Sequence, residues 1–144
     1  MDKIRMRVRF DYVGREKNGI LFFGSKTSEE MAEEIRQQQA ALFRNIPIQG
    51  ILIEEIDMGQ EVYSVTDDVT GKSTTYAPIT ISFYADSIAD AIKFSMKEEF
   101  RTIETIAPET LEIKKADIDR IILKANEGLS NYKSYIQRKI DHWK

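Results

Sequence analysis

Hydrophobic and polar residues alternate along the first part of the chain, which predicts a β-strand from Lys3 to Val13. Successive side chains of a strand point to opposite faces of a sheet, so this strand has an apolar face and a basic face. The apolar residues are Ile4, Met6, Val8, Phe10 and Tyr12, and the polar residues are Lys3, Arg5, Arg7, Arg9 and Asp11. We therefore expect one face of the strand to lie on a core.

Two later stretches have the signals of helices. Thr27 and Glu30 have the spacing of a capping box, so a helix should begin there and end before Pro47. Its apolar side is expected to contain Met31, Ile35, Leu42 and Phe43, with Glu29, Glu33 and Arg36 on other sides. Asp86 or Ser87 should cap the second helix. The apolar stripe expected for that helix is Ala89, Ile92, Met96 and Phe100.

The remaining segments predict strands. Ile48 to Ile56 is rich in isoleucine and indicates a buried strand, and Glu61 to Thr66 should stay extended. Residues 103–106 and 111–113 flank Pro108 and indicate a last strand, and Ile20 to Phe23 should form a short hairpin or continue into the next connection. In a long strand from Ser73 to Ala85, the inward residues are Ile79, Ile81 and Phe83, and the outward ones are Tyr76, Thr80, Ser82 and Tyr84.

The predicted order is β-α-β-β-α-β followed by a helix. This order is that of an α+β protein with a ferredoxin-like split βαβ fold, in a variant with an antiparallel sheet and an added long C-terminal helix. We expect a single domain, in which residues 1–114 form the sheet part and residues 115–144 form a helix that packs on it or on a partner chain.

The C-terminal helix is predicted from apolar residues that recur in steps of three and four. They are Ile118, Ile121, Ile122, Ala125, Leu129, Tyr132, Ile136, Ile140 and Trp143. At ~1.5 Å per residue this stripe is roughly 38 Å long, whereas a domain of this size has a radius of gyration of roughly 14–15 Å. Part of the stripe therefore needs a partner surface. Gly128 and the poor helix formers around it favour a kink or a break in the helix.

A second chain is one candidate for that partner surface, and the helix folding back along its own domain is the other. For self-association we expect a homo-oligomer, with a dimer favoured because a two-fold axis is the simplest arrangement. The residues that would carry it are Leu129, Tyr132, Ile136, Ile140 and Trp143.

Composition narrows the possible functions. The chain has no cysteine, which excludes disulfides, zinc–thiolate sites and cysteine nucleophiles. No apolar run reaches membrane-spanning length, so we expect no membrane partner and a cytoplasmic location. The formal net charge is −3, but residues 1–26 and 114–144 each carry +4 and residues 27–113 carry −11. Such basic ends and an acidic middle could attract one another within or between molecules.

The basic strand is the first candidate for a binding site. Arg5, Arg7 and Arg9 share a sheet face with Tyr76 and Tyr84, and such a set could bind an anionic ligand or single-stranded nucleic acid. Three other interpretations remain: a solvated face, pairing with carboxylates, or a face covered by the C-terminal helix. The carboxylates available on neighbouring strands are Glu54, Glu61 and Glu104. Because the chain is acidic overall and lacks RNA-binding aromatic motifs, nucleic-acid binding is not favoured.

Patterns typical of catalysis or of metal binding are missing. Gly71-Lys72-Ser73 resembles the end of a phosphate-binding loop, but Thr66 occupies the place of its first glycine and no helix follows. His142 is the only histidine, and the acidic pairs lack metal-loop spacing. We therefore predict no catalytic residues, metal or cofactor, although carboxylates and tyrosines distant in sequence could still converge into an enzyme site. The favoured interpretation is a small cytoplasmic protein that binds itself or a protein partner through the sheet face, the C-terminal helix or both.

Overall fold

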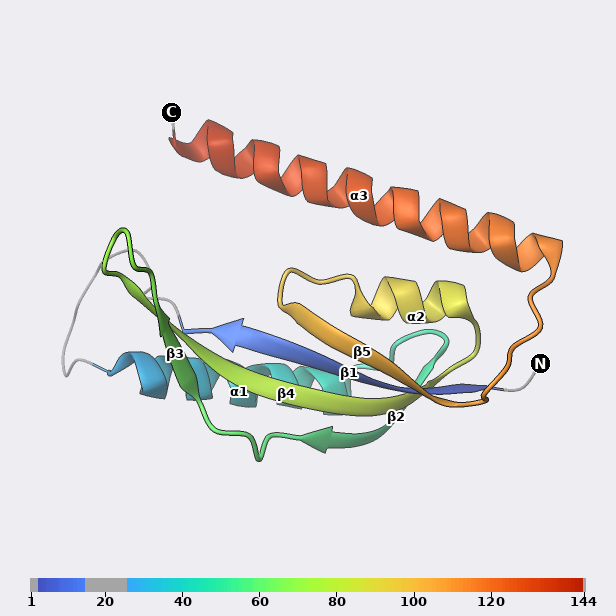
Figure 1. The fold of residues 1–144 in the computed structure, drawn as a ribbon, viewed down its shortest axis with the longest axis horizontal. Helices are drawn as coiled ribbons and strands as arrows, with labels where there is room; N and C mark the ends of the chain where they lie inside the picture. Colours follow the sequence, from blue (N-terminus) through green and yellow to red (C-terminus); the bar gives the residue numbers. More distant parts are fainter. Residues whose placement is uncertain (1–2, 15–25, 144) are drawn as a thin grey trace.

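The computed structural model describes residues 3–14 and 26–143, and within them the chain forms five strands and three helices (Figure 1). The predicted hairpin at Ile20 to Phe23 lies outside the described residues. The elements are β1 (Ile4–Val13), α1 (Ser28–Asn45), β2 (Ile51–Asp57), β3 (Tyr63–Thr66), β4 (Ser73–Ala85), α2 (Ile88–Ser95), β5 (Phe100–Ala107) and α3 (Lys115–Trp143).

The strands form one antiparallel sheet in the order β2-β4-β1-β5, and β3 pairs with the first residues of β4. The α+β class, the antiparallel sheet and the C-terminal helix predicted from the sequence are therefore confirmed. In the centre of the sheet Val8 lies opposite Ile81 and Arg9 lies opposite Thr80. β2 begins at Ile51 and not at Ile48, because Gly50 makes a turn with a φ of 78°.

One hydrophobic core fills the space between the sheet and the first two helices. The rings of Phe10 from β1, Phe43 from α1 and Phe94 from α2 meet there, with centroids 5.9–6.1 Å apart. Phe83 of β4 adds an edge contact to Phe94 at 4.8 Å. Since residues of both helices share this cluster with the inward residues of β1 and β4, α1 and α2 lie on the same face of the sheet.

The two predicted helix starts are confirmed, but the predicted apolar faces are partly wrong. Thr27 caps α1 and Ser87 caps α2. In α1 the buried face contains Ala32, Ala40 and Phe43, whereas Leu42 is exposed. In α2 the buried residues are Ala89, Ala91 and Phe94. That helix ends at Ser95, so Met96 follows it as the exposed C-cap and Phe100 belongs to β5.

Arg36 is the main departure in α1, because it was expected on a polar side but is only 6% exposed. Its guanidinium donates to the backbone carbonyls of Gln60 at 2.6 Å and Pro78 at 3.2 Å, and also to the Glu33 carboxylate. A buried charge is tolerated when its donors are satisfied. Arg36 thereby ties α1 to β4 and to the interruption between β2 and β3.

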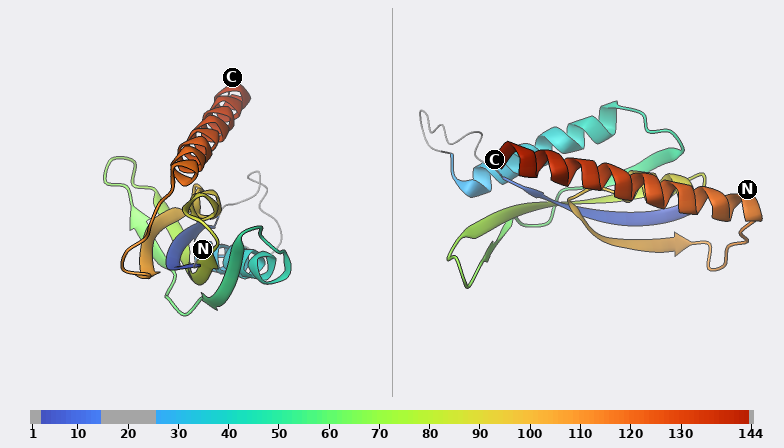
Figure 2. Two further views of the ribbon diagram at one scale, coloured as in Figure 1. Left: turned by 90° about the vertical axis from the view of Figure 1, so that its right-hand side faces the viewer. Right: turned by 90° about the horizontal axis from the view of Figure 1, so that it is seen from above.

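The helix α3 is continuous from Lys115 to Trp143 and runs straight in Figure 1, so the expected kink or break at Gly128 is wrong. It packs on α2, away from the sheet, and its C-terminal half extends past the end of α2 (Figures 1 and 2). A Cβ atom at position 128 would lie 1.4 Å from the sulfur of Met96. The glycine therefore allows a close approach between α3 and the end of α2, rather than a change of helix direction.

Candidate interaction surfaces

The sheet face opposite the core carries the predicted basic residues, and α3 does not cover it, because α3 packs on α2 at the core side. Covering by the C-terminal helix, one of the three alternatives for this face, is therefore wrong. Arg5, Arg7 and Arg9 are aligned along β1, and β4 adds Tyr76 and Tyr84 beside them. We call this surface the basic sheet face.

Two of these arginines pair with exposed carboxylates. Arg5 donates from Nη2 and Nε to Glu54 at 2.8 and 3.1 Å, and Tyr84 donates to the other oxygen of that carboxylate at 3.3 Å. Arg7 pairs with Glu104 at 3.2 Å. The hydrogen bond from Arg5 lowers the pKa of Glu54, and the same bond raises the pKa of Arg5. Pairing with Glu54 and Glu104, one of the expected alternatives, is therefore what the structure contains.

Asp11 is a buried anion on this face that the sequence did not single out. It is 1% exposed and accepts two hydrogen bonds from Arg9, at 2.8 and 3.1 Å. The Tyr63 hydroxyl also donates to Asp11, and Arg101 lies 3.6 Å away. Burial, followed by the hydrogen bond to Asp11, raises the pKa of Tyr63. The sequence does contain a signal for the pairing of Asp11 with Arg9, because two residues two positions apart lie on the same side of a strand.

Aromatic rings complete the cluster around Asp11. The Tyr63 and Tyr76 rings stack with centroids 5.3 Å apart, and the Arg101 guanidinium lies 5.1 Å from the centre of the Tyr76 ring. Arg9 lies 6.0 Å from the Tyr63 ring. The structure thus assembles the predicted arginines and tyrosines, but each arginine already faces a carboxylate. A phosphate ligand would have to compete with Glu54, Glu104 and Asp11 for them.

The second surface is the apolar face of α3, which the chain's own domain leaves largely exposed. Leu129 is 57% exposed and Tyr132 is 53% exposed, and Ile140 is exposed as well. Ile136 is half-buried. Trp143 is the last helical residue, and its side chain lies outside the described part. Ile118 and Ile122 extend the exposed row towards the start of the helix.

A groove of about 780 Å³ runs between the end of α2 and the middle of α3. Met96 and Lys97 line one side, and Gly128, Leu129 and Tyr132 line the other. The Tyr135 hydroxyl closes one end by donating to Glu98 at 3.0 Å. The groove is continuous with the exposed row on α3 through Leu129 and Tyr132, so both belong to one surface.

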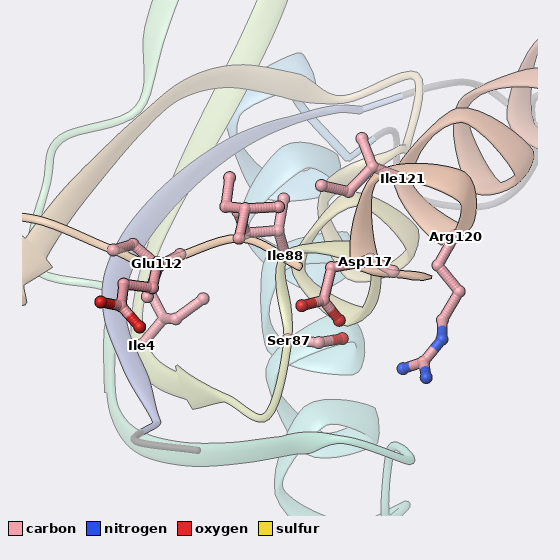
Figure 3. A pocket seen from close by; sticks show the side chains of 10 residues that line it. Ile4, Ser87, Ile88, Glu112, Asp117, Arg120 and Ile121 are labelled. Atoms are coloured by element: carbon pink, nitrogen blue, oxygen red, sulfur yellow. The ribbon is translucent and has the colours of Figure 1, made fainter. Parts of the chain in front are cut away.

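A small cavity lies where α3 begins, between Ile4, Ser87, Ile88 and Ile121 (Figure 3). Its volume is about 10 Å³, which is the space of roughly one water molecule. Asp117 and Arg120, near the start of α3, also line it. The cavity is therefore a packing gap at the α2–α3 junction rather than a ligand site.

Neither a metal site among the described residues nor a similar known protein points to a function. Within residues 3–14 and 26–143, no group of three or more acidic or histidine side chains could hold a metal ion. In the same part of the chain no helix has the length and hydropathy needed to cross a membrane. No protein-family model, curated protein or solved structure matches the sequence or the fold. The basic sheet face and the apolar face of α3 are therefore the two candidate interaction surfaces of the described residues.

Proposed function

We propose that this chain is an interaction protein that self-associates through the apolar face of α3. The observation that carries the proposal is the half-exposed row on that helix, above all Leu129 and Tyr132. Fully burying a large apolar side chain contributes ~1.5–3 kcal/mol, and a soluble protein seldom exposes such a row without a partner.

The contacts of α3 with its own domain support an association with a second chain. Gly128 lies against Met96 and Tyr135 lies against Glu98, so the domain contacts one flank of the helix. The row through Ile122 and Leu129 lies beside that flank and is left exposed. Folding back of α3 therefore leaves apolar area that a second copy could bury.

We also propose that the sheet is a variant of the ferredoxin-like split βαβ fold. The strand order β2-β4-β1-β5, with α1 after β1 and α2 after β4, supports this assignment. In this arrangement both helices pack on one face of the sheet, and α3 adds a further layer on α2. The extra strand β3 continues the edge that β2 begins.

The basic sheet face is the weaker candidate for a docking surface. Its arginines are paired with Glu54, Glu104 and Asp11, so binding an anion there would first break existing ion pairs. Apolar association through α3 requires no such exchange. This difference favours α3 as the primary interaction surface.

The proposal is tested by light scattering on the full chain and on two charge variants. The first variant combines Leu129→Glu and Tyr132→Glu. It places two carboxylates on the apolar row, so its mass in solution should fall to that of a monomer. Ser130→Glu with Ser134→Glu adds the same charges to exposed positions on another side of α3 and should leave the dimer intact. Equal masses for the two variants would refute the proposed surface.

A further inference from the structure

The apolar row on α3 has the spacing of a coiled-coil seam. Ile122, Leu129, Ile136 and Trp143 are each seven residues apart, and Ile118, Ala125 and Tyr132 each lie four residues before one of them. A seven-residue apolar repeat on a continuous helix is the pattern that pairs with another helix by knobs-into-holes packing. We infer that α3 forms an antiparallel two-helix coiled coil with α3 of a second copy of this chain. This inference rests on the proposed self-association and names its partner segment and direction.

The seam is free in the single chain because the domain contacts a neighbouring side of α3. Gly128 and Tyr135, which face Met96 and Glu98, are themselves seven residues apart. At 3.6 residues per turn they lie roughly 80° around the helix from the centre of the seam. A second helix can therefore lie along the seam while α2 keeps its place.

Charge favours the antiparallel direction. Residues 130–144 carry four basic side chains and one acidic one, whereas residues 115–129 carry three of each. A parallel pair would set the two basic halves side by side, but an antiparallel pair sets each basic half beside a neutral one. Antiparallel helix dipoles also attract each other, whereas parallel ones repel.

The position of Lys139 also favours the antiparallel direction. It takes the seam position that follows Tyr132 in the repeat, seven residues later. In a parallel pair two copies of Lys139 would face each other across the seam, which is destabilising for like charges. In an antiparallel pair Lys139 lies across from Ile122 of the second copy, so its aliphatic stem can cover that side chain while its amine reaches water.

The repeat allows antiparallel registers that differ by seven residues, and one of them pairs every seam position from Ile118 to Trp143. A two-fold axis between residues 130 and 131 places Leu129 across from Tyr132 of the second copy. It also places Ala125, the smallest seam residue, across from Ile136 of the second copy. The C-terminal half of α3, which extends past α2, then packs on the first half of the other α3. This arrangement covers the exposed seam residues of both halves, among them Ile118, Ile122, Leu129 and Tyr132.

Disulfide trapping tests the direction, and the chain has no cysteine that would interfere. Ile122→Cys and Lys139→Cys are made separately in the full chain, mixed and oxidised. In the antiparallel pair cysteines at 122 and 139 face each other, whereas two cysteines at 122 lie roughly 25 Å apart. The mixture should therefore form a linked dimer, and each variant alone should not. Arg138→Cys mixed with Ile122→Cys is the control and should not link, because position 138 lies on the opposite side of α3.

Each other outcome overturns the inference. Efficient linking of Ile122→Cys with itself would show a parallel pair, and no linking in any mixture would exclude this seam and register. Light scattering on the reduced variants separates this failure from failure of the proposed function. Reduced dimers without linking would leave self-association standing, whereas monomers that match a monomeric unmodified chain would remove both.

Discussion

Tyr12 and Tyr63, both in the sheet, differ in whether the phenol hydroxyl has a hydrogen-bond partner. Tyr12 is 4% exposed, and its hydroxyl has no hydrogen-bond partner among the described residues. Tyr63 instead donates to the buried carboxylate of Asp11. Burial raises the pKa of Tyr12, because the phenolate would be poorly solvated there. An unsatisfied hydroxyl weakens the fold, and a satisfied one on an anion strengthens it.

Replacing each tyrosine with phenylalanine should therefore change stability in opposite directions. Tyr12→Phe removes an unsatisfied group and should raise the free energy of unfolding by up to about 1 kcal/mol, and Tyr63→Phe should lower it by about 1.5–3 kcal/mol. Urea denaturation of both variants measures the difference. A larger loss for Tyr12→Phe than for Tyr63→Phe would contradict this account of the two hydroxyls.

The pair of Arg5 and Glu54 predicts a pH dependence. The hydrogen bond from Arg5 lowers the pKa of Glu54 in the folded state below its unfolded value of about 4.3. The stability that the Arg5–Glu54 pair contributes is therefore fully present above the unfolded pKa of Glu54 and is lost as the pH falls through its folded pKa. Between neutral pH and about pH 3, the unmodified chain should lose stability more steeply than Glu54→Gln. Parallel pH profiles of the denaturation midpoint would show that the pair contributes nothing.

For the helices, the sequence predicted the features that depend on neighbouring residues and missed those that depend on residues distant in sequence. The sequence predicted Thr27 as the cap of α1 and Asp86 or Ser87 as the cap of α2, and the caps are Thr27 and Ser87. Such predictions succeed because a cap depends on residues within one turn. The buried position of Arg36 was missed, because its acceptors at Gln60 and Pro78 are distant in sequence. Gly128 was misread for the same reason: its role comes from Met96, a residue of another element.

Gly128→Ala separates helix propensity from this contact. Alanine inside a helix is favoured over glycine by ~1 kcal/mol, but here its methyl group would displace the Met96 thioether. The substitution should therefore stabilise the chain by ~1 kcal/mol in a Met96→Ala background and by clearly less in the unmodified background. Denaturation of the four chains of this cycle gives the coupling. Equal gains in both backgrounds would mean that the contact does not constrain the helix.

At the scale of the whole molecule, the order of elements and the faces of β1 and β4 followed from periodicity. Val8, Ile81 and Phe83 lie in the core as the alternation predicted. The sequence named Glu54 and Glu104 among the carboxylates that could pair with the arginines of the basic sheet face, but it could not say which arginine meets which carboxylate. The register of β1 with β5 decides this for one pair, because it brings Arg7 beside Glu104. For α3 the sequence predicted an apolar row longer than its domain could cover. The structure shows which side of it the domain covers.

If the exposed row on α3 joins two copies of the chain, the average mass of the protein must depend on its concentration. Sedimentation equilibrium of the unmodified chain over a range of concentrations measures this dependence. The average mass should rise from the 16.7 kDa of one chain towards twice that value at tens of micromolar. High salt should not reverse the rise, because apolar burial is not screened as charge pairs are. A mass that stays at one chain at every concentration would contradict the account.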